Sequence, residues 1–170
     1  QSFSYHEPWW DHYAALGDYY ARLSLALSSG QQINKILVIE PTTTSWMYYS
    51  PTESNINLSK LGDAFQNFVV ELEKYQIEYD LAAENMITDI GKIEGKRFVA
   101  GKRAYDLVIF PPALENLDSY TFQFIKQYLK NGGHILSVNS NLKFIDGLET
   151  EDIESLMKKY SKQWKQSNSI

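Results

Sequence analysis

The chain contains no cysteine among its 170 residues. This absence excludes disulfide bonds, thiolate metal ligands and a cysteine nucleophile at once. No apolar run approaches the roughly 18 residues that a membrane-spanning helix requires, and no signal peptide is visible. The net charge is −5, so the sequence lacks the basic excess that nucleic acid binding needs, and nucleic acid is not an expected partner.

The sequence signatures of common catalytic and nucleotide-binding sites are also missing. There is no G-x-S-x-G elbow, Walker loop, G-x-G-x-x-G fingerprint or H-E-x-x-H helix. His6, His12 and His134 are too scattered along the chain to predict a metal site. Glu7 and Asp11 would lie one turn apart on a helix that includes both, but such pairs are usually solvated and rarely do glycosidic acid–base work. We therefore expect no catalytic residue, metal or cofactor in this chain.

What the chain does contain is an alternation of strand-like and helix-like segments. Short strands are predicted at residues 35–39, 77–80, 106–110 and 134–138. The first contains a continuous apolar run typical of a strand covered on both faces. Strands that alternate with helices predict right-handed crossovers, a parallel sheet and a flavodoxin-like strand order of 2-1-3-4. The expected fold is therefore an α/β, three-layer flavodoxin-like sandwich with a short parallel sheet and an added β-hairpin.

Two helices are predicted in the first half of the chain. Pro8 is placed where the first can begin, its apolar residues recur in alternating steps of three and four, and Gly30 is a natural stop. A loop is expected over residues 41–57. The second helix follows, with an apolar stripe that runs from Leu58 to Tyr75.

Two further helices are predicted in the second half. Asp118 is the expected N-cap of one, with Leu117 and Phe122 placed for a hydrophobic staple. The last helix is expected to begin at the cap Thr150 and to carry an apolar stripe as far as Trp164. Its acidic first turn and later lysines suit the helix dipole.

The predicted hairpin spans residues 91–102 and turns at Glu94-Gly95-Lys96. Because the sequence opens at Gln1 without a methionine, we expect a piece of a longer polypeptide. We divide the chain into a lead-in and first helix that packs on the domain, the α/β domain itself, and a polar, frayed tail. These are residues 1–30, 31–164 and 165–170.

Three segments are expected to converge at the carboxyl edge of the sheet, where open α/β sheets bind ligands. The hydroxyl-rich run at residues 42–45 could hydrogen-bond a phosphate or a sugar, but it has no glycine with which to wrap a phosphate. The simpler interpretation is a turn that caps the next segment. The candidate crevice residues are Glu40, Thr42, Thr43, Thr44, Trp46, Asn139 and Asn141.

An aromatic run near the start of the chain is the second candidate surface. Adjacent tryptophans before a helix can bury against a neighbouring domain, pack into the chain's own core or stack on a sugar ring. We favour packing between domains. The candidate contact residues are Tyr5, His6, Glu7, Trp9 and Trp10.

The order of several motifs resembles a known family of modules. These motifs are KIEGKRFV at 92–99, YDLVIFPP at 105–112 and NGGHIL at 131–136. Together they resemble a module of class I glutamine amidotransferase-like fold that follows the catalytic barrel in several large multidomain glycoside hydrolases. The likeness extends over most of the chain, from about Ser4 to Val138.

The first part of the chain is similar to a narrower group within this family. PWWD at 8–11, YYARLS at 19–24 and ILVIEP at 36–41 look like the segment after the barrel in α-L-rhamnosidase-like enzymes. A similar module of some bacterial β-galactosidases supports trimer assembly. The resemblance therefore implies a glycoside hydrolase parent in a bacterial periplasm or outside the cell.

The resemblance also implies an accessory role without catalysis. Amidotransferases carry a nucleophilic cysteine just after the strand that corresponds to residues 134–138, and this chain has Asn139-Ser140-Asn141 there. The implied partners are the catalytic barrel of the same polypeptide and homo-oligomer contacts, with carbohydrate an indirect partner at the rim of the barrel's active site. Two alternatives remain: a flavin- or nucleotide-binding domain that uses residues 42–46, and a carbohydrate-binding module that uses Trp9 and Trp10.

Overall fold

The computed structural model describes residues 4–169 and divides the chain into two compact units. The first unit ends at Ile33 and the second begins at Asn34. The expectation that the first helix packs on the α/β domain stays a prediction. Within residues 4–169, no helix has the length and apolar character needed to cross a bilayer.

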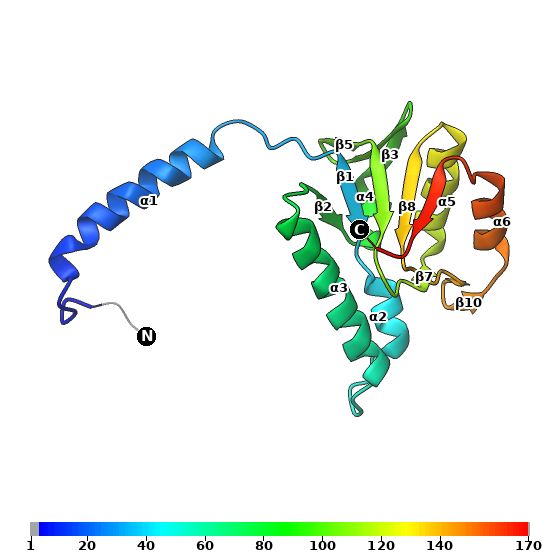
Figure 1. Ribbon diagram of the computed structural model, residues 1–170, viewed down its shortest axis with the longest axis horizontal. Helices are drawn as coiled ribbons and strands as arrows, with labels where there is room; N and C mark the ends of the chain where they lie inside the picture. Colours follow the sequence, from blue (N-terminus) through cyan, green and yellow to red (C-terminus); the bar gives the residue numbers. More distant parts are fainter. Residues whose placement is uncertain (1–3, 170) are drawn as a thin grey trace. The chain divides into compact units, whose positions relative to one another are not determined.

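The first unit is a single helix with a short lead-in (Figure 1). A 3₁₀ turn at Trp10–His12 leads into α1, Tyr13–Ser28, so the helix begins later than the Pro8 start that we predicted. Gly30, with φ +90°, follows its end as expected. No residue of the 3₁₀ turn or of α1 is buried, so neither element contributes to a core within residues 4–33.

The second unit is built on a five-stranded, all-parallel sheet (Figure 1). The order β11-β8-β6-β1-β2 confirms the predicted order 2-1-3-4 and adds a fifth strand at the edge. The strands are β1 (Ile36–Ile39), β2 (Asp80–Ala82), β6 (Leu107–Phe110), β8 (His134–Val138) and β11 (Trp164–Ser167).

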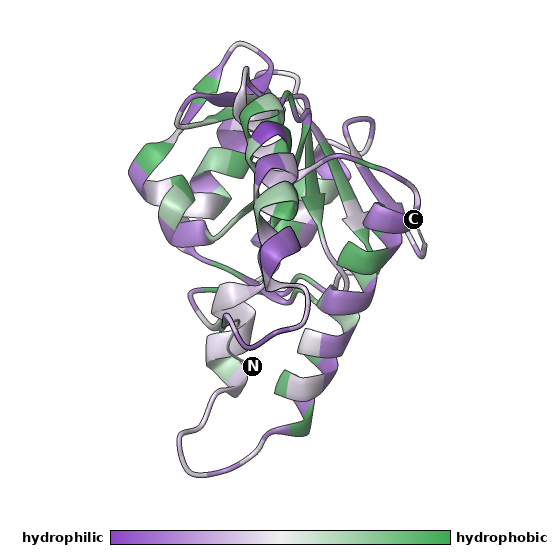
Figure 2. Ribbon diagram, turned by 90° about the vertical axis from the view of Figure 1, so that its left-hand side faces the viewer, coloured by the Kyte–Doolittle hydropathy of each residue, from purple (hydrophilic) through white to green (hydrophobic). Residues whose placement is uncertain are grey.

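Helices cover both faces of this sheet because its central strands are apolar on both sides. On one face, Val38 of β1 joins Phe68 and Leu72 of α3, Ile56–Lys74. On the other face, Leu37 and Ile39 join the core beneath three helices. These are α4 (Glu84–Ile90), α5 (Ser119–Lys130) and α6 (Asp152–Lys159). The strands of the sheet are mostly green in the hydropathy colouring of Figure 2.

Two small sheets flank the main one. The predicted hairpin is confirmed as β3, Gly91–Glu94, and β4, Arg97–Ala100, and β5, Arg103–Tyr105, extends it to three antiparallel strands. Gly95 in its turn has φ +59°, which favours glycine. The second small sheet consists of β7 (Asn116–Leu117), β9 (Phe144–Ile145) and β10 (Leu148–Glu149).

The predicted N-cap at Asp118 is confirmed, since its Oδ1 accepts a hydrogen bond from the Thr121 N–H at 2.5 Å. Two other local predictions were wrong. The expected loop at 41–57 contains a helix, α2, Thr42–Tyr48. The second strand lies at Asp80–Ala82 rather than at 77–80, because pairing with β1 sets its position. Residues 42–45, which begin α2, are hydroxyl residues with low helix propensity, so contacts from elsewhere in the fold are needed to favour this helix.

The end of the chain also differs from its prediction. The last helix stops at Lys159, and the chain turns before Trp164. Trp164 begins β11, and residues 165–167, assigned above to a frayed tail, pair with β8. Trp164 continues an apparent helical stripe, but its ring is buried in the core that β6 and α6 share. Parallel pairing with β8 therefore outweighs the local periodicity.

Gly133 offers a test of packing between α5 and β8. A Cβ at this position would lie 2.2–2.4 Å from the ring of the fully buried Tyr128. Gly133→Ala is therefore expected to lower the free energy of unfolding by about 1–3 kcal/mol through overpacking, as measured by urea denaturation. Gly62→Ala is the control, because it lies in α3 with open space around it and should stabilise by roughly 0.5–1 kcal/mol. Equal effects of the two substitutions would contradict the packing argument.

Candidate functional site

The three segments expected to converge at the carboxyl edge of the sheet do lie together. The Thr44 Oγ1 accepts hydrogen bonds from the backbone N–H groups of Glu115 and Asn116, at 3.1 and 3.0 Å. The Ala113 N–H donates to the Asn139 carbonyl at 3.2 Å. The chain after β1 is thus joined to the chain after β6, which in turn is joined to the chain after β8.

Most hydroxyls of the run at 42–45 are used inside the protein. Thr44 is completely buried. The Thr43 hydroxyl donates to the Glu84 carboxylate, and the Ser45 hydroxyl donates to the Pro41 carbonyl at 2.8 Å. The run is therefore the start of a helix rather than the predicted capping turn, and its bonds leave few donors for a phosphate.

Glu84 is a buried acid that the sequence analysis did not single out. It begins α4, is 1% exposed, and accepts hydrogen bonds from the Thr43 hydroxyl and from the Asp118 N–H, the latter at 2.6 Å. Burial raises the pKa of Glu84 to about 7, and the nearby Asp118 carboxylate acts in the same direction, although the two hydrogen bonds oppose the shift. Nothing in the local sequence distinguishes Glu84 from a surface acid, because only the tertiary fold buries it.

A further contact joins the end of α2 to the chain after β6. The Tyr48 hydroxyl donates a hydrogen bond to the Glu115 carboxylate at 2.5 Å, and this bond raises the pKa of Tyr48.

Three of the remaining crevice candidates lie on or beside α2. Glu40 and Thr42 line a hollow of about 270 Å³ between α2 and α3. Trp46 is 67% exposed on the outer side of α2.

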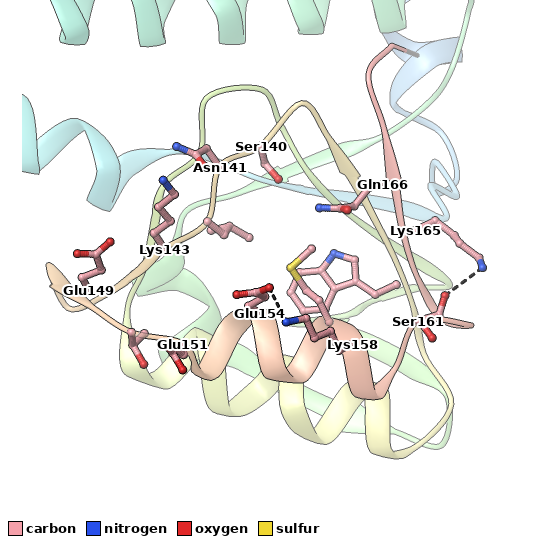
Figure 3. Close-up of a pocket in the computed structure, with 14 residues that line it drawn as sticks. Ser140, Asn141, Lys143, Glu149, Glu151, Glu154, Lys158, Ser161, Lys165 and Gln166 are labelled. Carbon is pink, nitrogen blue, oxygen red and sulfur yellow. Dashed lines mark hydrogen bonds and ion pairs between the residues drawn. The ribbon is translucent and has the colours of Figure 1, made fainter.

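A large hollow lies beside the ends of β8 and β11 (Figure 3). It is a groove of about 900 Å³. Leu142, Met157 and Trp164 are its apolar lining residues, and charged residues of α6, β10 and the segment after β8 surround them. Asn141 lines this groove, as its place in the crevice suggested, whereas Asn139 does not.

An exposed ion pair lies in the wall of the groove. Glu154 and Lys158 are 2.6 Å apart, and their contact lowers the pKa of Glu154 and raises the pKa of Lys158. The contact therefore favours the charged form of both side chains. Among residues 4–169, no group of three or more acidic, histidine or cysteine side chains could hold a metal ion.

The turn after β8 places Asn139, a residue without a nucleophilic side chain, in a left-handed backbone conformation. Asn139 has φ +49°, a left-handed conformation that is uncommon outside glycine. Its N–H donates to the Ser167 carbonyl at 2.8 Å, which joins this turn to the end of β11. Asparagine tolerates this conformation better than most residues, and its amide offers no nucleophilic atom for acyl transfer.

The aromatic contact candidates all lie in the first unit. Tyr5, Trp9 and Trp10 are 72%, 54% and 44% exposed. The Tyr5 ring contacts the His6 ring, with the ring centroids 3.9 Å apart. Glu7 precedes the 3₁₀ turn, so it does not share a regular helix with Asp11 as a catalytic pair would need.

No protein-family model matches the chain, and a comparison with curated proteins finds no match either.

The hydrogen bonds to the Thr44 hydroxyl should contribute to the stability of the fold. Thr44→Val keeps the shape of the side chain but leaves the N–H groups of Glu115 and Asn116 buried without an acceptor. The free energy of unfolding should fall by about 2–4 kcal/mol, measured by urea denaturation. Thr44→Ser retains the oxygen and should cost less than half as much. A Val variant as stable as the Ser variant would show that these bonds contribute little.

The raised pKa of Glu84 should make the stability of the fold depend on pH. Its pKa is raised from 4.5 to about 7 in the folded protein, so between these values the folded state binds more protons than the unfolded state. Stability should therefore fall as the pH rises from about 4.5 to above 7, by roughly 3 kcal/mol from this group. Urea denaturation at pH 5 and pH 8 measures the slope.

Glu84→Gln should remove this contribution, because the amide is neutral at every pH. Its oxygen can still accept from the Asp118 N–H, and its amide nitrogen can donate to the Thr43 hydroxyl. The exposed Glu53→Gln is the matched control and should leave the slope unchanged. If Glu84→Gln keeps the slope of the unsubstituted protein, Glu84 is not its source.

Proposed function

We propose that this chain is a non-catalytic accessory module of a multidomain glycoside hydrolase. In this proposal the α/β unit is of the class I glutamine amidotransferase-like type and the parent enzyme is α-L-rhamnosidase-like. The module packs on the catalytic barrel of the same polypeptide and makes homo-oligomer contacts. The proposed location is the bacterial periplasm or the extracellular space.

The observation that carries the proposal is the closure of the carboxyl edge of the sheet after β1 and β6. A flavodoxin-like fold binds ligands or places a nucleophile at this edge. Here Thr44 and Glu84 accept hydrogen bonds from backbone N–H groups of the chain after β6 at this edge. Asn139 is the left-handed residue of the turn after β8. A fold whose usual working edge is closed in this way suits a structural role.

The first unit supplies the proposed contact surface. Tyr5, His6, Trp9 and Trp10 precede a helix with no buried residue, and Trp and Tyr are enriched at protein interfaces. A helix that buries nothing within its own unit gains stability by packing against another domain. We therefore assign these four residues to the face toward the barrel.

The alternative functions find less support. A flavin- or nucleotide-binding domain would need free donors at residues 42–46, and three of these hydroxyls are engaged within the protein. A carbohydrate-binding module would use Trp9 and Trp10 as a stacking platform. Calorimetry with flavin mononucleotide and affinity gels with embedded polysaccharide are both expected to show no binding.

The test of the proposal has two parts. First, the chain is assayed on aryl α-L-rhamnosides and aryl β-galactosides, and no turnover above the blank is expected. Turnover that a single substitution abolishes would overturn the non-catalytic assignment. Second, the gene upstream of the Gln1 codon is sequenced, and a barrel-sized coding region is expected there. A stop codon close upstream would overturn the assignment to a larger enzyme.

The longer protein then tests the contact residues. Trp9→Ala with Trp10→Ala should separate the unfolding of the module from that of the barrel in calorimetry, because the packing between them is lost. Trp46→Ala changes an exposed tryptophan of the second unit; it is the control and should leave the unfolding transition intact. Unchanged unfolding in both variants would contradict the proposed contact.

A further inference from the structure

A second groove of the α/β unit lies between α5 and α6, the two helices on the outer side of the sheet in Figure 1. It has a volume of about 480 Å³ and shares no lining residue with the groove beside β8 and β11. Its charged lining residues within residues 4–169 are all lysines: Lys126 and Lys130 of α5, and Lys159 of α6. This single sign of charge contrasts with the net charge of −5 of the whole chain.

The three ammonium groups remain available for an anion, because none of them forms an ion pair within residues 4–169. The Lys126 Nζ lies 5.5 Å from the centre of the Phe122 ring, and the Lys159 Nζ lies 5.4 Å from the centre of the Tyr160 ring. Contact with an aromatic face holds an ammonium group in place without neutralising it. The C-termini of α5 and α6 offset only part of this charge, about −0.5 each, so an excess of about two positive charges is left.

One carboxylate lies beside the groove but not in it. Asp152 lines a smaller hollow of about 200 Å³, which Lys126 and Lys159 also line. It begins α6, where a negative charge suits the helix dipole. Asp152 forms no ion pair with either lysine. The lysines therefore face the groove without a carboxylate of their own chain bound to them.

Carboxamide side chains lie between the lysines. Gln123 and Gln127 share the exposed face of α5 with its two lysines, because these four positions recur in steps of three and four. Asn131, directly after α5, also lines the groove. Within residues 4–169, none of these three carboxamides forms a side-chain hydrogen bond. Each offers both a donor and an acceptor, as a peptide backbone requires of its partner.

The spacing of the lysines favours an extended polypeptide over a small anion. Lys126 and Lys130 are four residues apart on α5, which corresponds to about 6 Å along the helix axis. In an extended chain, side chains two residues apart point to the same side and are about 6.6–6.8 Å apart. Acidic side chains at alternate positions of such a chain therefore match both lysines. A small inorganic anion would leave the carboxamides unused.

We propose that the groove between α5 and α6 binds an extended acidic segment of a partner protein. Carboxylates at alternate positions of the segment pair with Lys126 and Lys130, a further carboxylate pairs with Lys159, and the carboxamides bond the backbone of the segment. Charge complementarity of this kind gives specificity and speeds association. The inference does not rest on the proposed function, because it uses only α5 and α6 of the second unit.

The test is an NMR titration of the whole chain with a synthetic eight-residue peptide that carries three glutamates at alternate positions among serines. Saturable shifts are expected along the exposed face of α5 and at Lys159. The affinity should fall about fivefold between roughly 50 and 300 mM sodium chloride, because salt screens exposed ionic contacts. Absence of saturable shifts, or shifts confined to other elements, would overturn the proposal.

Two control peptides separate charge from spacing. A peptide with glutamine in place of each glutamate should not bind. A peptide of the original composition with a glutamate at every third position should bind about threefold more weakly, because its carboxylates no longer match the two lysines of α5. Equal binding of all three peptides would show that neither charge nor an extended segment is recognised.

Paired substitutions locate the binding surface. Lys126→Gln with Lys130→Gln should weaken binding of the alternating peptide about tenfold. The matched control is Lys60→Gln with Lys102→Gln, which removes the same charge from two exposed lysines outside the groove and should bind within about threefold of the unsubstituted chain. Equal weakening by both pairs would show that net charge alone attracts the peptide, and would overturn the groove as its site.

Two further measurements distinguish other occupants. Inorganic phosphate should bind at least tenfold more weakly than the peptide. Phosphate that saturates the same residues as tightly would indicate a small-anion site and overturn a polypeptide partner. Sedimentation should show no dimer that depends on the lysines. A dimer that Lys126→Gln with Lys130→Gln dissociates would indicate that the acidic residues at 149–154 of a second copy occupy the groove, and would overturn a separate partner.

Discussion

The bond from two backbone N–H groups to the hydroxyl of Thr44 holds the carboxyl edge of the sheet closed. It anchors α2 to the chain after β6, and Thr43 beside it reaches the buried Glu84. Buried backbone groups must find partners or cost free energy. This contact therefore holds α2 beside the chain after β6 and keeps Thr43 within reach of Glu84.

The accessible groove lies beside this closed part of the edge, next to the carboxyl ends of β8 and β11. Leu142, Met157 and Trp164 are its apolar lining residues, and charged residues surround them. The ion pair of Glu154 and Lys158 lies in its wall, on α6. Elsewhere, α1 of the first unit has no buried residue, and β11 lies at one edge of the main sheet.

Much of the architecture could be predicted from local pattern. The apolar runs of β1, β6 and β8, the Asp118 cap and the hairpin turn at Gly95 each depend on neighbouring residues alone. The elements that were not predicted depend instead on residues far away in the sequence. Thr42–Tyr48 is helical because partners some 70 residues away satisfy its hydroxyls, and β11 is a strand because β8 offers a free edge. Of the site, the convergence of three segments was predictable, but the groove and Glu84 were not.

The sequence by itself determined the α/β class, the strand order and the absence of cysteine chemistry, because hydrophobic period and residue type act locally. Only the tertiary structure decided which polar groups are buried. Glu84 and Glu154 look alike in the sequence, yet burial gives one a pKa of about 7 and an exposed lysine lowers that of the other. The ionisation of a side chain depends on its surroundings, and those are assembled from segments far apart along the chain.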